Sequence, residues 1–273
     1  MKLSIVTISF NQANFLERAM RSVLEQRGVD VEYIIVDPGS TDGSRDIIER
    51  YRPQLAHVVY EKDDGPADGL NKGFARATGD WLAYINSDDF FLHGALQQAV
   101  NAIVKAGNAD CVYANGYLTD AEGRPFRRVI STPFDAQSFV WGRSLVLQQS
   151  TFIKAESFRK VGGFNTANRT SWDAELLVDM SLAGMTLKHV PGYWSAFVLH
   201  AGSITGSQRH AALSVGNHER MFQKVMGRGR TAADLRRRRL NSYLARLQHP
   251  GTLVAQVADR LLPNRLPRKL LES

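Results

Sequence analysis

The stretch LSIVTISFNQANFLERAMRSVL, residues 3–24, joins two different periodicities. Residues 3–9 are mostly apolar and β-branched, which is typical of a buried strand. Apolar side chains then recur at helical spacing, at Phe15, Leu16, Ala19, Met20, Val23 and Leu24. A strand followed directly by an amphipathic helix is the repeating unit of α/β domains, so the stretch predicts an α/β fold with a mainly parallel sheet flanked by helices.

The same alternation continues through the first half of the chain. The patterns predict strands over 31–37, 58–61 and 81–86, and helices over 44–51, 68–77 and 92–106. Residues 109–154 look rich in strands, and residues 172–183 look like a helix that Thr170 or Ser171 opens. We expect an α/β domain over 1–206, with halves 1–107 and 108–206, followed by a basic helical extension over 207–273.

Charge is distributed unevenly along the chain. Residues 200–273 hold 14 Lys and Arg against 4 Asp and Glu, a net charge of +10, whereas the rest holds 34−14=20 against 27−4=23, a net charge of −3. The arginine block 236–239 precedes Leu240, Tyr243, Leu244 and Leu247 at helical spacing. Such a helix either lies on an anionic membrane surface or packs on the body through its leucines. No basic surface interleaved with aromatic residues indicates nucleic-acid binding.

The sequence predicts no signal peptide, no membrane-spanning segment and no internal disulfide. The apolar N-terminal stretch stops at Asn11 and lacks a cleavage site, and no apolar run approaches the ~20 residues that span a bilayer. A single cysteine, Cys111, lies in an apolar run and reads as a core side chain. We expect a cytoplasmic protein, with attachment to the inner face of the cell membrane as the alternative.

Polar side chains follow three of the predicted strands, at Asn11, at 37–42 and at 86–89. Ligands of open α/β sheets bind outside the carboxyl ends of the strands, so these segments predict one shared site. The glycine fingerprint of dinucleotide-binding proteins does not follow the first strand, where residues 9–14 read SFNQAN, and this disfavours a nicotinamide dehydrogenase.

Two adjacent carboxylates, Asp88 and Asp89, end the segment Ile85-Asn86-Ser87-Asp88-Asp89. They repel each other, and a diphosphate beside them adds about 4 kcal/mol per close pair at an effective dielectric near 20. A divalent cation removes that conflict, and oxygen ligands suit Mg²⁺ or Mn²⁺. The structural alternative is a solvated loop that caps the next helix.

Two further segments allow both a structural and a binding reading. In the turn DPGSTDG, residues 37–43, Asp42 or Ser44 can cap a helix, while Asp37 can accept hydrogen bonds from a nucleobase or ribose. In residues 64–80, Asp68 and Asn71 share one helical face, either in a capped helix start or in a donor-binding loop.

The order of these segments resembles glycosyltransferase family 2 over roughly the first 200 residues. The blocks are SFN at 9–11, DPGSTDG at 37–43, DGLNKG at 68–73, ATGD at 77–80 and NSDD at 86–89. The resemblance implies a GT-A fold with a Rossmann-like sheet, an inverting reaction and a nucleotide-sugar donor. It implies that Asp88 and Asp89 bind the metal. The donor-binding residues that it implies are Ser9, Asn11, Asp37, Ser40, Asp68, Asn71, Lys72, Asn86 and Asp88.

The resemblance also implies residues for the acceptor side. The family's base is an acidic residue that opens a helix in the second half, which corresponds to Asp173, with Glu175 as the competing base. Trp172 would form a floor for the acceptor sugar unless it belongs to the core, and Gln149 would lie on the acceptor side. His200 lies where many members place a histidine near the metal or the phosphates, although a structural histidine is the alternative.

The chain departs from the usual family pattern at four places. Pro38 follows the first aspartate, Asn86 stands where the acidic motif often begins with aspartate, and Gln148 replaces a frequent histidine. Asp179 stands where an arginine is common.

The function that the resemblance implies is transfer of a sugar from a UDP-, GDP- or dTDP-linked donor to a glycan or a lipid-linked acceptor, which we expect to serve bacterial surface-polysaccharide assembly. The first alternative is a sugar-phosphate nucleotidyltransferase, which would need a glycine- and lysine-rich triphosphate loop that residues 9–14 lack. The others are a hydrolase with two carboxylates and a non-catalytic nucleotide-sugar-binding adaptor with a basic tail.

Overall fold

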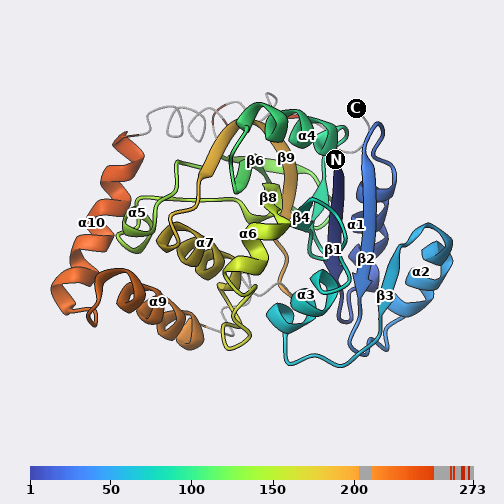
Figure 1. Cartoon of the computed structure of the whole chain (residues 1–273), viewed down its shortest axis with the longest axis horizontal. Coiled ribbons are helices and arrows are strands. Elements are labelled where there is room, and N and C mark those ends of the chain that lie inside the picture. Colours follow the sequence, from blue (N-terminus) through green and yellow to red (C-terminus); the bar gives the residue numbers. More distant parts are fainter. Residues whose placement is uncertain (203–210, 249–258, 260, 262–265, 268–269, 271–273) are drawn as a thin grey trace.

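The computed structural model describes residues 1–202, 211–248, 259, 261, 266, 267 and 270 (Figure 1). Within them, one curled sheet forms the centre of the molecule, with the strand order β3-β2-β1-β4-β8-β6-β9-β5 and with β7 paired to β6. The expected boundary at residues 206 and 207 lies outside the described residues.

The strands are β1 Lys2–Ile8, β2 Asp30–Val36, β3 His57–Val59, β4 Trp81–Tyr84, β5 Phe90–Phe91, β6 Cys111–Thr119, β7 Pro125–Val129, β8 Thr151–Lys154 and β9 Leu187–Val198. The helices are α1 Ala13–Leu24, α2 Ser44–Tyr51, α3 Pro66–Phe74, α4 Ala95–Ala106, α5 Ala136–Val140, α6 Ala155–Lys160, α7 Trp172–Leu182, α9 Ala211–Met226 and α10 Ala232–Gln248.

The sheet is parallel in the first half of the chain and mixed beyond it. Strands β3, β2, β1 and β4 are parallel neighbours, as the α/β pattern predicts. Strand β8 then pairs antiparallel with both β4 and β6, while β6 and β9 are parallel. The expectation of a mainly parallel sheet therefore holds for the first four strands and for the pair of β6 with β9, while the remaining pairs of the described sheet are antiparallel.

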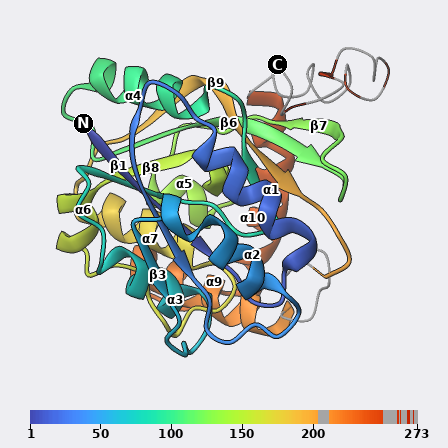
Figure 2. The same ribbon diagram turned by 90° about the vertical axis from the view of Figure 1, so that its right-hand side faces the viewer.

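Alternate residues of β1 face the two sides of the sheet, and each side is covered by its own helices. Leu3 and Ile5 pack with side chains of α1, α2 and α4, whereas Val6 packs with side chains of α3, α6 and α7. Figure 2 shows α4 and α3 on opposite sides of the sheet. This two-sided cover leaves the edge at the carboxyl ends of β1, β2 and β4 for a site.

Element boundaries differ slightly from those expected. The helix predicted from residue 92 begins at Ala95, because Gly94 has φ +68° and interrupts the helical backbone. The segment 109–154 contains β6, β7 and β8 but also α5. Ser171 occupies the position before α7 without a capping hydrogen bond from its side chain.

The basic extension packs on the body at its beginning. Met221 of α9 lies in one apolar cluster with Val178 of α7 and Ala136 of α5. Figure 1 shows α9 and α10 at one end of the molecule and β3 with α2 at the other. In the described part of the chain, no helix is long and apolar enough to cross a bilayer.

Candidate active site

Backbone hydrogen bonds bring the predicted segments together at the carboxyl edge of the sheet. The amide of Ser9 donates to the carbonyl of Val36 at 2.9 Å, and the amide of Ser87 donates to the carbonyl of Ile8 at 3.3 Å. The residues after β1, β2 and β4 are therefore held side by side, so three of the segments predicted to share a site do so.

Asp37 is buried at this edge, and only one of its two carboxylate oxygens has hydrogen-bond partners among the described residues. Its Oδ1 accepts from the amides of Gly39 at 3.0 Å and Ser40 at 2.8 Å, and from Arg45 Nε at 3.0 Å. Its Oδ2 is buried without a hydrogen-bond partner among the described residues, and so is Ser9 Oγ at the end of the neighbouring strand. A buried polar atom without a hydrogen bond lowers the stability of the fold by about 1–3 kcal/mol. These two atoms therefore indicate a ligand that hydrogen-bonds to them.

Asn11 and Ser40 fasten the loops around this position. The amide of Asn11 donates to Ser40 Oγ at 2.8 Å, and the amide of Thr41 donates to Asn11 Oδ1 at 2.9 Å. Asp42 links the same loops, because its carboxylate accepts from the amides of Ala13 and Ser44. Gly43 occupies the N-cap of α2 without a side-chain capping bond, so neither Asp42 nor Ser44 caps that helix as expected, although Asp42 accepts from the amide of Ser44. The donor contacts of Asn11 and Ser40 remain predictions.

The segment 64–80 is held mainly by its own contacts. Asp68 accepts from the amide of Asp64 at 3.0 Å and pairs with Lys72 Nζ at 2.9 Å. Asn71 donates to the carbonyl of Phe164 at 2.8 Å and accepts from its amide at 3.0 Å. Both polar atoms of Asn71 therefore tie α3 to the loop before α7, which contradicts a donor-binding role for this side chain.

Asp89 points into the protein, contrary to the expectation that it binds a metal. Its side chain is 0% exposed, Oδ1 accepts from the amide of Val198 at 2.9 Å, and Oδ2 accepts from Gln149 at 2.8 Å and Asn86 at 3.1 Å. Burial and the neighbouring Asp88 raise the pKa of Asp89 well above its usual range. Gln149 and Asn86 each donate to Asp89 through the side-chain amide nitrogen, and an acceptor contact of Gln149 remains a prediction.

Asp88 and His200 remain as the metal-binding candidates. Asp88 Oδ2 lies 3.0 Å from His200 Nε2, and the two side chains are 14% and 12% exposed. The histidine ring packs against Phe15 in a tilted arrangement, with 4.5 Å between the ring centroids. The described residues contain no group of three or more His, Cys, Asp or Glu side chains that could hold an ion. Mg²⁺ commonly takes one or two protein carboxylates and completes its shell with water and substrate phosphates, so this pair fits a cation that the substrate helps to hold.

Asp173, the expected base, lies in the first turn of α7 beside an apolar cavity of ≈ 80 Å³. Burial raises the pKa of Asp173 above its usual range, partly opposed by backbone hydrogen bonds from Ala174 and from its own amide. A carboxylate with a raised pKa is a stronger base, which suits proton abstraction from a hydroxyl. Its role as base stays a prediction.

Trp172 belongs to the core, contrary to its expected place beneath an acceptor. It is 7% exposed, packs with Leu176 and Leu177, and donates from Nε1 to Tyr84 Oη at 2.9 Å. The structure therefore supports the alternative reading of this tryptophan.

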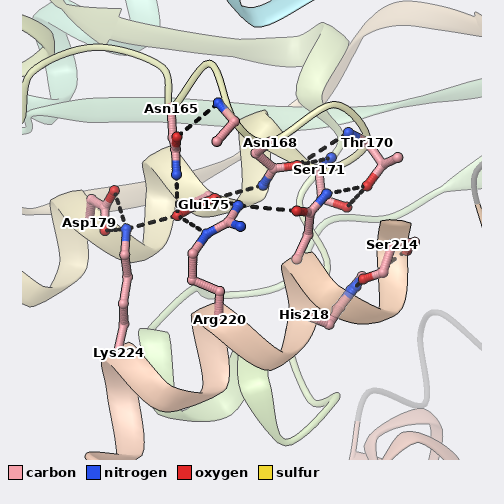
Figure 3. A network of polar contacts seen from close by, with 12 residues as sticks. Asn165, Asn168, Thr170, Ser171, Glu175, Asp179, Ser214, His218, Arg220 and Lys224 are labelled. Carbon is pink, nitrogen blue, oxygen red and sulfur yellow. Dashed lines mark hydrogen bonds and ion pairs between the residues drawn. The ribbon is translucent and has the colours of Figure 1, made fainter. Parts of the chain in front are cut away.

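Glu175, the competing base, is fully engaged in a polar network (Figure 3). Its two carboxylate oxygens accept from Arg220, Lys224, Asn165 and Asn168 at 2.7–3.0 Å. Burial raises the pKa of Glu175, but these hydrogen bonds outweigh it and bring the pKa to about 2. Such a weakly basic, enclosed carboxylate is poorly suited to take the acceptor proton, so the structure favours Asp173 over Glu175 as the base.

The sequence patterns did not identify two positively charged residues of the site, Arg18 and Arg45. Arg18 of α1 is half-buried, donates to the carbonyl of Asp88 at 3.4 Å and lies over the Phe90 ring at 4.9 Å. Arg45 binds Asp37 from the first turn of α2. A positive charge is unfavourable near the positive end of a helix dipole. The position of Arg45 in the first turn of α2 therefore indicates that a nearby anion compensates it.

Comparisons with known proteins identify the family and the fold of the chain. Residues 4–171, more than half of the chain, match glycosyl transferase family 2. An uncharacterized glycosyltransferase of Mycobacterium tuberculosis is 30% identical over 66% of this chain and 69% of its own length. A putative teichuronic acid biosynthesis glycosyltransferase of Bacillus subtilis is 35% identical over 48% of this chain and 53% of its own. An uncharacterized glycosyltransferase of Nostoc is 39% identical, but the match spans only 32% of that protein.

Solved structures share the fold at low sequence identity. The mannosyltransferase PcManGT of Pyrobaculum calidifontis, in complex with GDP-Man and Mn²⁺, has a TM-score of 0.62 at 18% identity, over 97% of this chain and 76% of that one. TarS 1–349 of S. aureus in complex with UDP-GlcNAc has a TM-score of 0.59 at 14% identity, over 83% and 72%. The expected GT-A fold is thereby confirmed. Together with the match over residues 4–171, the mycobacterial relative establishes that the chain belongs to glycosyl transferase family 2.

Proposed function

We propose that this protein transfers a sugar from a nucleoside diphosphate donor to an acceptor hydroxyl, with inversion at the anomeric carbon. The observation that carries the proposal is the unsatisfied pair at the sheet edge, Asp37 Oδ2 and Ser9 Oγ. A nucleoside carries both hydrogen-bond donors and acceptors, so it can form hydrogen bonds with both of these atoms. Relatives of the same fold bind UDP-GlcNAc and GDP-Man, and this supports a nucleotide-sugar ligand.

The proposed reaction is a single displacement. The acceptor oxygen attacks the anomeric carbon while Asp173 takes the hydroxyl proton, and the bond from that carbon to the diphosphate oxygen breaks as the nucleoside diphosphate leaves. A divalent cation, Mn²⁺ or Mg²⁺, held by Asp88 and His200 would stabilise the charge on the leaving diphosphate. The teichuronic acid relative supports a role in assembly of a bacterial surface polysaccharide, with a glycan or lipid-linked acceptor.

Donor binding is expected to depend on a metal. Calorimetric titration with UDP and GDP should show at least about tenfold tighter binding with Mn²⁺ than with EDTA, since a charge-assisted contact contributes about 1.5–3 kcal/mol. Asp88→Asn should remove the gain, whereas Asp46→Asn, which changes an exposed carboxylate of α2, should keep it. Equal binding with and without Mn²⁺ would disprove the metal site, and binding without subsequent transfer would indicate the adaptor.

Helix α10 has the exposure pattern of a surface-binding element. The leucines of α10 whose side chains the structure describes are exposed, Leu235 at 48%, Leu240 at 58% and Leu244 at 43%, while Asp234 and Asn241 are buried. This contradicts packing on the body through Leu240 and Leu244, and the side chains of Tyr243 and Leu247 lie outside the described residues. With Arg236 and Arg237 exposed beside these leucines, we propose contact with an anionic membrane surface.

The protein is therefore expected to co-sediment with vesicles that contain phosphatidylglycerol. Leu240→Asn combined with Leu244→Asn should weaken this binding at least about tenfold, because each buried leucine contributes about 1.5–3 kcal/mol. The matched control is Leu182→Asn with Leu213→Asn, two leucines that are exposed on α7 and α9. The membrane contact would be refuted if both double variants lost vesicle binding equally, or if the wild type bound anionic and neutral vesicles equally well.

A further inference from the structure

The cavity beside Asp173 is apolar on nearly every side. It is lined by strands β4 and β8, by helices α3, α5, α6 and α7, and by the loop segment that includes Leu145 and Val146. Its largest lining side chains are aromatic: Phe74, Tyr84, Phe134, Phe139, Phe158 and Phe164. Polar side-chain atoms in the lining come from the Tyr84 hydroxyl and from Ser144, Gln148, Thr151 and Asp173.

Four of these five polar side chains already hydrogen-bond within the protein. Tyr84 Oη accepts from Trp172 Nε1 at 2.9 Å, and the other three donate to backbone carbonyls. Ser144 donates to the carbonyl of Pro133 at 3.0 Å, Gln148 to that of Tyr84 at 3.0 Å, and Thr151 to that of Leu147 at 3.0 Å. Asp173 is left as the polar group that faces a ligand. A water molecule needs about two to four polar partners, so the cavity favours an apolar occupant over water.

The size of the cavity limits that occupant. An engineered apolar cavity of about 150 Å³ in another protein binds benzene, and ≈ 80 Å³ is about half of that volume. The space therefore suits a group of one to a few carbon atoms rather than a sugar ring or a long chain.

We infer that the acceptor places a small apolar substituent in this cavity while its reacting hydroxyl meets Asp173. Suitable substituents are the C-methyl group of a deoxy sugar, the methyl group of an acetamido sugar, or a short alkyl group at the reducing end. The inference rests on the proposed transferase function and names the chemistry of its acceptor. A hydroxymethyl group in the same place would lose its hydrogen bonds to water and gain none from these walls.

The inference is tested with acceptor pairs that differ at one group: methyl L-fucoside against methyl L-galactoside, N-acetylglucosamine against glucosamine, and propyl against methyl glucoside. The readout is kcat/KM from release of the nucleoside diphosphate, after subtraction of donor hydrolysis by water. The apolar member of at least one pair should be preferred by about 10- to 100-fold, which is the discrimination that apolar pockets reach. The pair that shows this preference also identifies the group that occupies the cavity: a methyl group of the sugar, an acetyl group or an aglycone.

Ala174→Leu provides the matching variant, because Ala174 lines the cavity and a larger side chain there fills it. It should abolish the preference and leave nucleotide binding unchanged, whereas Ala183→Leu, at an exposed position just after α7, should keep the preference. Equal use of both members of every pair, or a preference that survives Ala174→Leu, would overturn the inference.

A second measurement does not depend on that variant or on turnover. In wild-type protein with UDP and Mn²⁺, ¹²⁹Xe NMR should detect xenon in the cavity, and the preferred acceptor should displace it. Xenon that binds but is not displaced by any of the probes would overturn the inference while leaving the proposed function intact. Absence of nucleotide binding in the same sample would instead refute the proposed function.

Discussion

Replacement of Asp173 with asparagine is expected to lower kcat by about 10²- to 10⁴-fold, the usual contribution of a general base. Asparagine has nearly the same shape, so the fold and the apolar cavity should persist, but its amide cannot accept the acceptor proton. The affinity for the donor nucleotide should not change, because neither Asp37 nor Asp88 lines the cavity beside Asp173. Release of nucleoside diphosphate and calorimetric binding measure the two effects separately.

Asp179→Asn is the matched control, since it removes a carboxylate from the same helix, where Asp179 pairs with Lys224 at the surface. It should retain most of the turnover. Because burial raises the pKa of Asp173, activity should rise with pH through an inflection above the usual range of an aspartate. Turnover of Asp173→Asn equal to that of the control would remove Asp173 from the mechanism.

The first half of the fold could be predicted because its signals are local. Residues 3–24 contain a strand pattern and a helix pattern side by side, and the parallel neighbours β1, β2 and β4 follow from repetition of that unit. Asp37 could be singled out for the same reason: a carboxylate directly after a buried strand lies at the carboxyl edge of a parallel sheet.

The mixed half of the sheet depends on pairings between distant segments. Strand β6 pairs with β7, β8 and β9, and no local periodicity distinguishes these partners from one another. The direction of Asp89 was unpredictable for the same physical reason. Its partners Gln149 and Val198 lie 60 and 109 residues away, so the sequence could not show which of two adjacent carboxylates turns inward.

Glu175 illustrates this limit most clearly, because its neighbours in sequence suggest a base and its neighbours in space disfavour it. Replacement of both Arg220 and Lys224 with methionine is expected to destabilise the fold by about 3–5 kcal/mol, since a fully buried carboxylate then loses both of its cations. Urea unfolding at neutral pH measures the loss. Arg50→Met, which breaks an exposed pair with Glu17, should cost less than about 1 kcal/mol.

The pH dependence of that loss separates an electrostatic cause from lost packing. In the wild type the pKa of Glu175 is about 2 in the folded state and near 4.5 when unfolded, so its contribution is complete above pH 4.5 and disappears as the pH falls toward 2. In the double variant the same burial acts without the cations, which raises the folded pKa above the unfolded one and makes protonation stabilising. The stability difference between the two proteins should therefore shrink at about pH 3.5. A difference that stays constant from neutral pH to this value would show that the methylenes of Arg220 and Lys224, rather than their charges, hold α9 against α7.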